Sequence, residues 1–102
     1  MDTIDHIAIV VQDVDRAVSW YTSEFKCAVE WQDESWAFLR FENCALALVR
    51  PGEHPNHFAI LTNYIDLYGR PNAHRDGTRS VYRTDLDGNV LEMLERPAQA
   101  SA

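Results

Sequence analysis

Two histidines and one glutamate lie in strand-like segments whose other side chains are mostly apolar. They are His6 within residues 4–11, His57 within residues 56–61, and Glu92 within residues 90–94. Residues two apart share one face of a strand, so each of these side chains is expected on an apolar face. Because a buried, unpaired carboxylate is costly, Glu92 needs a positive partner. A divalent cation held by two neutral imidazoles and one carboxylate would supply it and would keep positions open for substrate or water.

Each of these residues also has a simpler interpretation. A single histidine on an apolar face is more often a hydrogen-bonded core residue, and Glu92 alone could lie on an edge strand or pair with an arginine. The repeat of His6-Ile7-Ala8-Ile9 as His57-Phe58-Ala59-Ile60 favours a shared role for the set. His54 and His74 lie in loop-like segments and are expected at the surface.

Tyr82 is a candidate catalytic residue. If residues 85–89 (Asp-Leu-Asp-Gly-Asn) form a hairpin loop, Thr84 faces Val90 and Tyr82 faces Glu92 on the same side of the sheet. The tyrosine hydroxyl could then orient an oxygen ligand or pass a proton. An aromatic filler whose hydroxyl reaches the backbone is an equally good interpretation.

The elements that must position these residues fall into two units. Residues 4–11 read as a strand that is apolar on both faces and hence buried on both sides. Asp13 is the expected N-cap of a helix through residue 27, and strands follow at 28–32, 36–41 and 44–49. The order is therefore βαβββ.

The second unit repeats this order in a shorter form. Strands are expected at 56–61, 78–84 and 90–94, with one helical turn at 64–68 that Gly69 and Pro71 end. This organisation predicts one domain over 1–95, with a first module at 1–52, a shortened second module at 53–95, and a disordered tail at 96–102.

Composition and charge narrow the function classes. The net charge of -7 disfavours nucleic-acid binding. No apolar run is long enough for a membrane span, and the acidic start predicts no signal peptide, so a cytoplasmic protein with two buried thiols, Cys27 and Cys44, is expected. Four arginines in residues 69–84 form either a solvated basic loop, which we favour, or an anion-attracting rim. The side chains of Arg79 and Arg83 are expected to face away from the interior.

Two stretches resemble the vicinal oxygen chelate superfamily, which includes glyoxalase I, extradiol dioxygenases, fosfomycin-resistance enzymes and bleomycin-resistance proteins. The opening stretch is Asp5-His6-Ile7-Ala8-Ile9-Val10-Val11 with Asp13, Asp15-Arg16-Ala17 and Trp20-Tyr21. The closing stretch is Gly77-Thr78-Arg79-Ser80-Val81-Tyr82 with Asp85-Leu86-Asp87-Gly88-Asn89-Val90-Leu91-Glu92. The resemblance covers nearly the whole chain. It implies an α+β fold in which paired βαβββ modules form an open, cupped sheet around a metal.

By position, the resemblance implies that His6, His57 and Glu92 bind one divalent metal ion (Fe, Mn, Zn or Ni). The fourth family position falls at about Ala47, which cannot bind metal, so glyoxalase I activity is less favoured. The remaining set is similar to that of extradiol dioxygenases and fosfomycin-resistance transferases, which also tend to carry a tyrosine at the place of Tyr82. Because the second module is short, one wall of the pocket is expected to be missing or to come from another chain, which predicts a homodimer.

Two functions follow from the resemblance. The first is a metal-dependent enzyme, dioxygenase-like or transferase/lyase-like, whose small-molecule substrate chelates the metal through adjacent oxygens. The alternative is a non-catalytic binding protein of the bleomycin-resistance type, which the acidic charge and the three tryptophans would suit. The retained ligand set favours the enzyme.

Overall fold

The computed structural model of the protein describes residues 1–97 and contains eight strands, one α-helix and one 3-10 helix. The first half of the chain holds β1 (Ile4–Val10), α1 (Val14–Glu24), β2 (Ala28–Gln32), β3 (Trp36–Arg40) and β4 (Ala45–Val49). The second half holds β5 (His57–Leu61), η1 (Ile65–Tyr68), β6 (Asn72–Ala73), β7 (Arg79–Thr84) and β8 (Val90–Glu95). The expected α+β class and the two-part order are confirmed.

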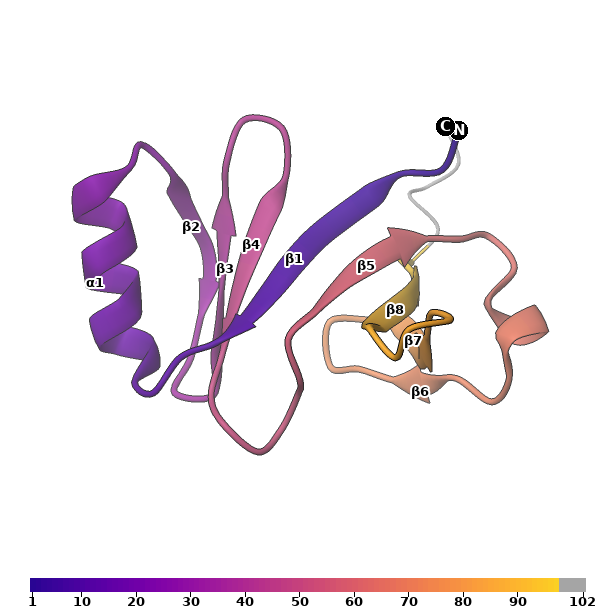
Figure 1. Cartoon of the computed structure of the whole chain (residues 1–102). Helices are drawn as coiled ribbons and strands as arrows, with labels where there is room; N and C mark the ends of the chain where they lie inside the picture. The colour runs from indigo at the N-terminus through magenta and orange to yellow at the C-terminus, as the bar shows by residue number, and fades with distance from the viewer. Residues whose placement is uncertain (98–102) are drawn as a thin grey trace.

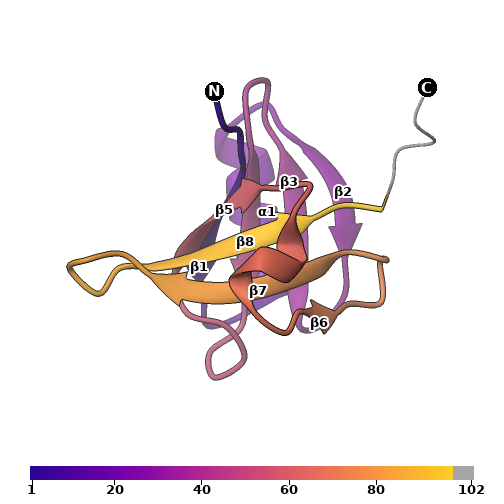
Figure 2. The ribbon, with the colours of Figure 1, turned by 90° about the vertical axis from the view of Figure 1, so that its right-hand side faces the viewer.

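All eight strands form one mixed sheet in the order β2-β3-β4-β1-β5-β8-β7-β6. Each half has the same pattern: its first strand runs parallel to its last, and the remaining pairs are antiparallel. The halves join where β1 pairs with β5 in antiparallel orientation. The sheet is curled, and the strands of the second half lie across those of the first (Figures 1 and 2). The middle of the sheet therefore contains β1, β5 and β8.

Helix α1 covers the first half of the sheet, on the side seen at the left of Figure 1. Asp13 caps its first turn by accepting a hydrogen bond from the backbone N–H of Arg16 at 3.1 Å, as expected. Val14 and Val18 lie on its buried stripe and pack with three residues of β3 and β4: Ala37, Leu39 and Leu48. The helix ends at Glu24, three residues before the expected end, because Phe25 has extended backbone.

In the second half, η1 stands where the first half has a helix. Ile65 is fully buried there, and η1 packs against β7 and β8. Gly69, with a φ of 124°, ends the turn as expected. Strand β6 was not predicted from the sequence, because two residues are too few to show an alternation of apolar and polar side chains.

The prediction that the first strand is buried on both faces was wrong. Its inner face is buried at His6 and Ala8, but Ile7 on its outer face is 47% exposed. The cause is the placement of the helices: α1 packs against β3 and β4, and η1 packs against β7 and β8, while β1 lies between them. Neither helix among the described residues is long and apolar enough to cross a membrane.

Candidate metal centre

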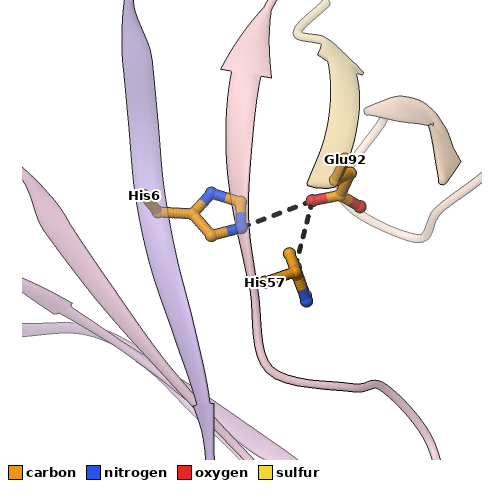
Figure 3. Close-up of side chains that lie close together, drawn as sticks. All are labelled: His6, His57 and Glu92. Atoms are coloured by element: carbon orange, nitrogen blue, oxygen red, sulfur yellow. Dashed lines mark ion pairs between the residues drawn. The ribbon is translucent and has the colours of Figure 1, made fainter. Parts of the chain in front are cut away.

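His6, His57 and Glu92 come from three adjacent strands, β1, β5 and β8. The pairing register places His6 opposite Ala59 and Ala59 opposite Glu92, so these residues form one row across the sheet. His57 lies two residues before Ala59 and therefore on the same face of β5. Ala59 carries only a methyl group, which leaves room for the three longer side chains, and these converge on one point (Figure 3).

The three side chains are buried and lie within ion-pair distance. The Nε2 atoms of His6 and His57 lie 3.4 Å and 3.5 Å from the same carboxylate oxygen, Oε1 of Glu92. Both distances exceed the usual range of an N–H···O hydrogen bond, which is about 2.7–3.2 Å. They are close to the separation of neighbouring ligand atoms that each lie about 2.1 Å from one metal ion. Among the described residues, this is the one cluster of its kind whose ligand atoms could hold a metal ion together.

The outward nitrogen of each histidine is bound to an acceptor. Nδ1 of His6 lies 2.7 Å from Oδ2 of Asp5, and Nδ1 of His57 lies 2.7 Å from the backbone carbonyl of Pro55. A carbonyl and an ionised carboxylate can only accept, so in each neutral ring the proton resides on Nδ1. Each Nε2 then presents its lone pair to the site, which is the tautomer that a metal ligand requires.

The electrostatics of the cluster favour a positive charge next to Glu92. Burial alone would raise the pKa of Glu92, but the nearby imidazole rings of His57 and His6 outweigh it and hold the pKa well below its ordinary range. Burial alone would lower the pKa of His6, but the neighbouring carboxylates of Asp5 and Glu92 outweigh this effect and raise the pKa. The carboxylate therefore stays ionised, and a cation beside it is stabilised.

The cluster lies in a cavity of about 680 Å³ that is lined by residues from both halves of the sheet. All four histidines of the chain line it. The expectation that His54 and His74 are surface residues was wrong: both are half-buried in the cavity wall. Both lie in connections between strands, and no local pattern in the sequence places them at the cavity.

Tyr82 faces Glu92 across the β7–β8 hairpin, and Thr84 faces Val90, as predicted from the loop at residues 85–89. The ring of Tyr82 packs edge-on against that of His57, with centroids 5.1 Å apart. Its hydroxyl lies 2.8 Å from Nδ1 of His54. Burial, together with the charge of Glu92, raises the pKa of Tyr82 above its ordinary value, so the hydroxyl keeps its proton and can act as a donor.

An aromatic wall forms the opposite side of the cavity. Successive rings in this wall pack against one another. The ring centroids lie 6.1 Å apart for Trp31 and Trp36, 5.9 Å for Trp36 and Phe38, and 5.3 Å for Phe38 and His6. Ala47 adds only a methyl group to the cavity lining. The wall gives the cavity an apolar surface that extends from the histidine cluster to the rim.

The arginines near the site are matched by partners within the chain. Arg75 pairs with Asp33 at 3.1 Å, and Arg79 pairs with Glu95 at 2.7 Å. Arg83 lies over the ring of Tyr68, on the η1 side of the sheet. Arg79 and Arg83 therefore face away from the cavity, as expected. These contacts favour the solvated basic segment over an anion-attracting rim.

Comparison with known families identifies the class of protein. The model of the Glyoxalase/Bleomycin resistance protein/Dioxygenase superfamily matches residues 3–101, and the chain belongs to this superfamily. The resemblance seen in the two sequence motifs is thereby confirmed. A search of the curated proteins finds no significant relative of the chain.

Solved structures share the fold. A methylmalonyl-CoA epimerase, solved with methylmalonyl-CoA and NH4+, is 20% identical with a TM-score of 0.79, and 96% of each chain is covered. The methylmalonyl-CoA epimerase of Streptomyces coelicolor is 22% identical with a TM-score of 0.76, covering 93% of this chain and 97% of that one. A superfamily member from Vibrio splendidus 12B01 is 11% identical with a TM-score of 0.71, covering 93% and 99%. At these identities the likeness concerns the fold alone.

Proposed function

We propose that this protein is a divalent-metal-dependent enzyme whose small-molecule substrate chelates the metal through adjacent oxygens. In this proposal His6, His57 and Glu92 are the three protein ligands. One observation carries it: two imidazoles present Nε2 to the same buried carboxylate oxygen, while each Nδ1 is held by an acceptor. Three protein ligands leave positions open for substrate, as a catalytic site requires.

A bound metal would act as a Lewis acid on two neighbouring oxygens of the substrate. The protein's own groups do the rest. Tyr82 donates a hydrogen bond toward the substrate, while Nδ1 of His54 donates to the tyrosine oxygen and orients the hydroxyl. The aromatic wall of Trp31, Trp36 and Phe38 holds the apolar part of the substrate and excludes water.

The reaction class depends on the metal. Iron would favour oxygenation, and manganese or zinc would favour isomerisation or addition of a thiol or water. Ala47 leaves the family's fourth ligand position without a donor atom, which makes a glyoxalase I reaction less favoured. In every case the substrate must offer a pair of oxygens that can reach the metal together.

A non-catalytic binding protein of the bleomycin-resistance type is the alternative. The exposed Trp31 next to Trp36, in a chain with a net charge of -7, supports it, because aromatic rings and acidic groups bind flat cations. A pure binding protein has no need of the three converging ligand side chains. Metal analysis therefore separates the two functions.

The test is the metal content of protein purified without a chelating tag, followed by uptake of Fe(II), Mn(II), Ni(II) and Zn(II). We expect about one divalent ion per chain in the wild type and none in His57→Ala. His74→Ala is the matched control, since it removes another cavity histidine and should keep the ion. A wild-type chain that takes up none of the four metals would overturn the metalloenzyme and favour the binding protein.

A further inference from the structure

Arg96 follows the last strand and reaches back to the start of the first. Its Nε and Nη2 atoms contact Oδ1 and Oδ2 of Asp5 at 2.9 Å and 2.6 Å. The carboxylate of Asp5 is buried, at 9% exposure. Arg96 was expected to open a disordered tail at residues 96–102. It is instead held by a two-point ion pair, and residues 98–102 lie outside the described part of the chain.

Asp5 is also the partner of His6, although the two residues are neighbours in a strand. Side chains of consecutive strand residues normally point to opposite faces. The pairing of β1 with β5 shifts register between Ile4 and His6, at the position of Asp5. This irregularity allows Oδ2 of Asp5 to reach Nδ1 of His6 at 2.7 Å.

Arg96 thus contacts both groups that hold the ring of His6. Its ion pair occupies both oxygens of Asp5, which leaves the carboxylate one orientation. Its guanidinium also lies over the ring of Phe38, 5.8 Å from the centroid, and Phe38 packs against the ring of His6. The hydrogen-bond partner and the packing partner of His6 are therefore both braced by one side chain.

We propose that Arg96 is a positioning residue that acts through Asp5 to fix the tautomer and orientation of His6, and thereby sets the protein's affinity for a divalent metal. This inference rests on the proposed function, because it takes His6 as a ligand. Outer hydrogen-bond partners of metal-binding histidines typically change metal affinity by about 10- to 100-fold. Arg96, which follows the last strand, is thereby connected through Asp5 to His6 on the first strand.

The experiment measures Zn(II) affinity by competition with a chelator, for the full chain and matched variants. We expect about 10-fold weaker binding in Arg96→Ala, partial recovery in Arg96→Lys, and about 10- to 100-fold weaker binding in Asp5→Asn. Arg79→Ala is the control: it removes an arginine of similar exposure that pairs with Glu95 on the opposite face of the sheet, and should bind within about twofold of the wild type. Circular dichroism and thermal unfolding establish that each variant is folded.

A second measurement follows the tautomer of His6 directly, by ¹⁵N chemical shifts of the imidazole in metal-free protein. At a pH where the ring is neutral, the wild type should carry the proton on Nδ1, and Arg96→Ala should give a mixture of tautomers. Wild-type affinity and an unchanged tautomer in a folded Arg96→Ala variant would overturn the inference. A wild type that takes up none of Fe(II), Mn(II), Ni(II) and Zn(II) would instead overturn the proposed function, whatever the tautomer.

Discussion

At the scale of single residues, the centre depends on a small side chain as much as on its polar ones. Ala59 separates His6 from Glu92 in the row across β1, β5 and β8, and it is fully buried. A larger residue there would occupy the space in which the three side chains meet. Ala8 and Ala47 also have small side chains, and they leave the cavity open between the aromatic wall and the histidines.

Tyr82 offers a test at this scale. Its hydroxyl is bound to His54, outside the proposed ligand set, so Tyr82→Phe should leave Zn(II) affinity unchanged within about twofold. Acetohydroxamate, which presents two adjacent oxygens, should bind the Zn(II) protein about 5- to 10-fold more weakly, because one hydrogen bond is lost. Calorimetric titration measures both affinities.

The control for this prediction is Tyr68→Phe, which removes a hydroxyl on the opposite side of the sheet. Equal acetohydroxamate affinity in the wild type and in Tyr82→Phe would show that the hydroxyl does not face the substrate. Tyr82 would then be an aromatic filler bound to His54.

At the scale of elements, the 3-10 helix η1 covers the sheet of the second half, as α1 covers that of the first. Ile65 is fully buried between η1 and the sheet, whereas Leu67 in the same turn is 81% exposed. Ile65→Ala should lower the free energy of unfolding by about 2 to 4 kcal/mol, since it leaves a cavity that the turn cannot fill. Leu67→Ala should change it by less than about 0.5 kcal/mol. Urea unfolding measures both, and equal effects would mean that η1 contributes no core.

The β2–β3 turn is held by one carboxylate. Asp33 accepts hydrogen bonds from the backbone N–H of Ser35 at 2.8 Å and of Trp36 at 3.0 Å. Burial alone would raise its pKa, but these bonds and the hydroxyl of Ser35 outweigh it and lower the pKa from 3.8 to about 2. The turn thereby sets the start of the strand that carries Trp36 and Phe38.

A carboxyl with a lower pKa in the folded state stabilises the fold above its unfolded pKa and loses that effect as pH falls through its folded pKa. Asp33→Ala should therefore destabilise the protein by about 1 kcal/mol at pH 6, and the difference from the wild type should shrink between about pH 4 and pH 2. Urea unfolding of both proteins across this range measures the difference. A difference that stays constant with pH would contradict this role of the ionised carboxylate.

At the scale of the whole molecule, two similar halves share one continuous sheet, and the centre forms where they join. The shortened second half does not leave the cavity without a wall: His74, Arg75 and Thr78, around β6 and the turn after it, contribute to the lining. These residues supply a wall of the cavity from within the chain. The homodimer remains a prediction, and we propose the outer face of the central strands as the surface through which two chains would pair.

Ile7 is 47% exposed on that outer face, between the areas covered by α1 and η1. If two chains pack there, light scattering should give twice the 11.7 kDa chain mass for the wild type. Ile7→Lys should shift the mass to that of one chain, because a charge would be buried in the interface. A monomeric wild type at micromolar concentration would contradict the prediction.

Much of this protein could be predicted from its sequence because the relevant signals are local. Alternating apolar residues marked the main strands, Asp13 marked the start of α1, and the hairpin loop at residues 85–89 determined that Tyr82 faces Glu92. The repeat of a histidine at the start of two strands indicated that His6 and His57 belong together. Each of these signals spans a few residues, and short-range geometry is sufficient to interpret it.

The tertiary structure alone decided which side chains surround the candidate centre. His54 meets Tyr82, and Arg96 meets Asp5, across 28 and 91 positions of the chain. The irregular pairing at Asp5 and the exposure of Ile7 depend on which strands and helices lie next to β1. Contacts of this kind arise from the order of strands in the folded sheet, so no periodicity or local motif in the sequence could have specified them.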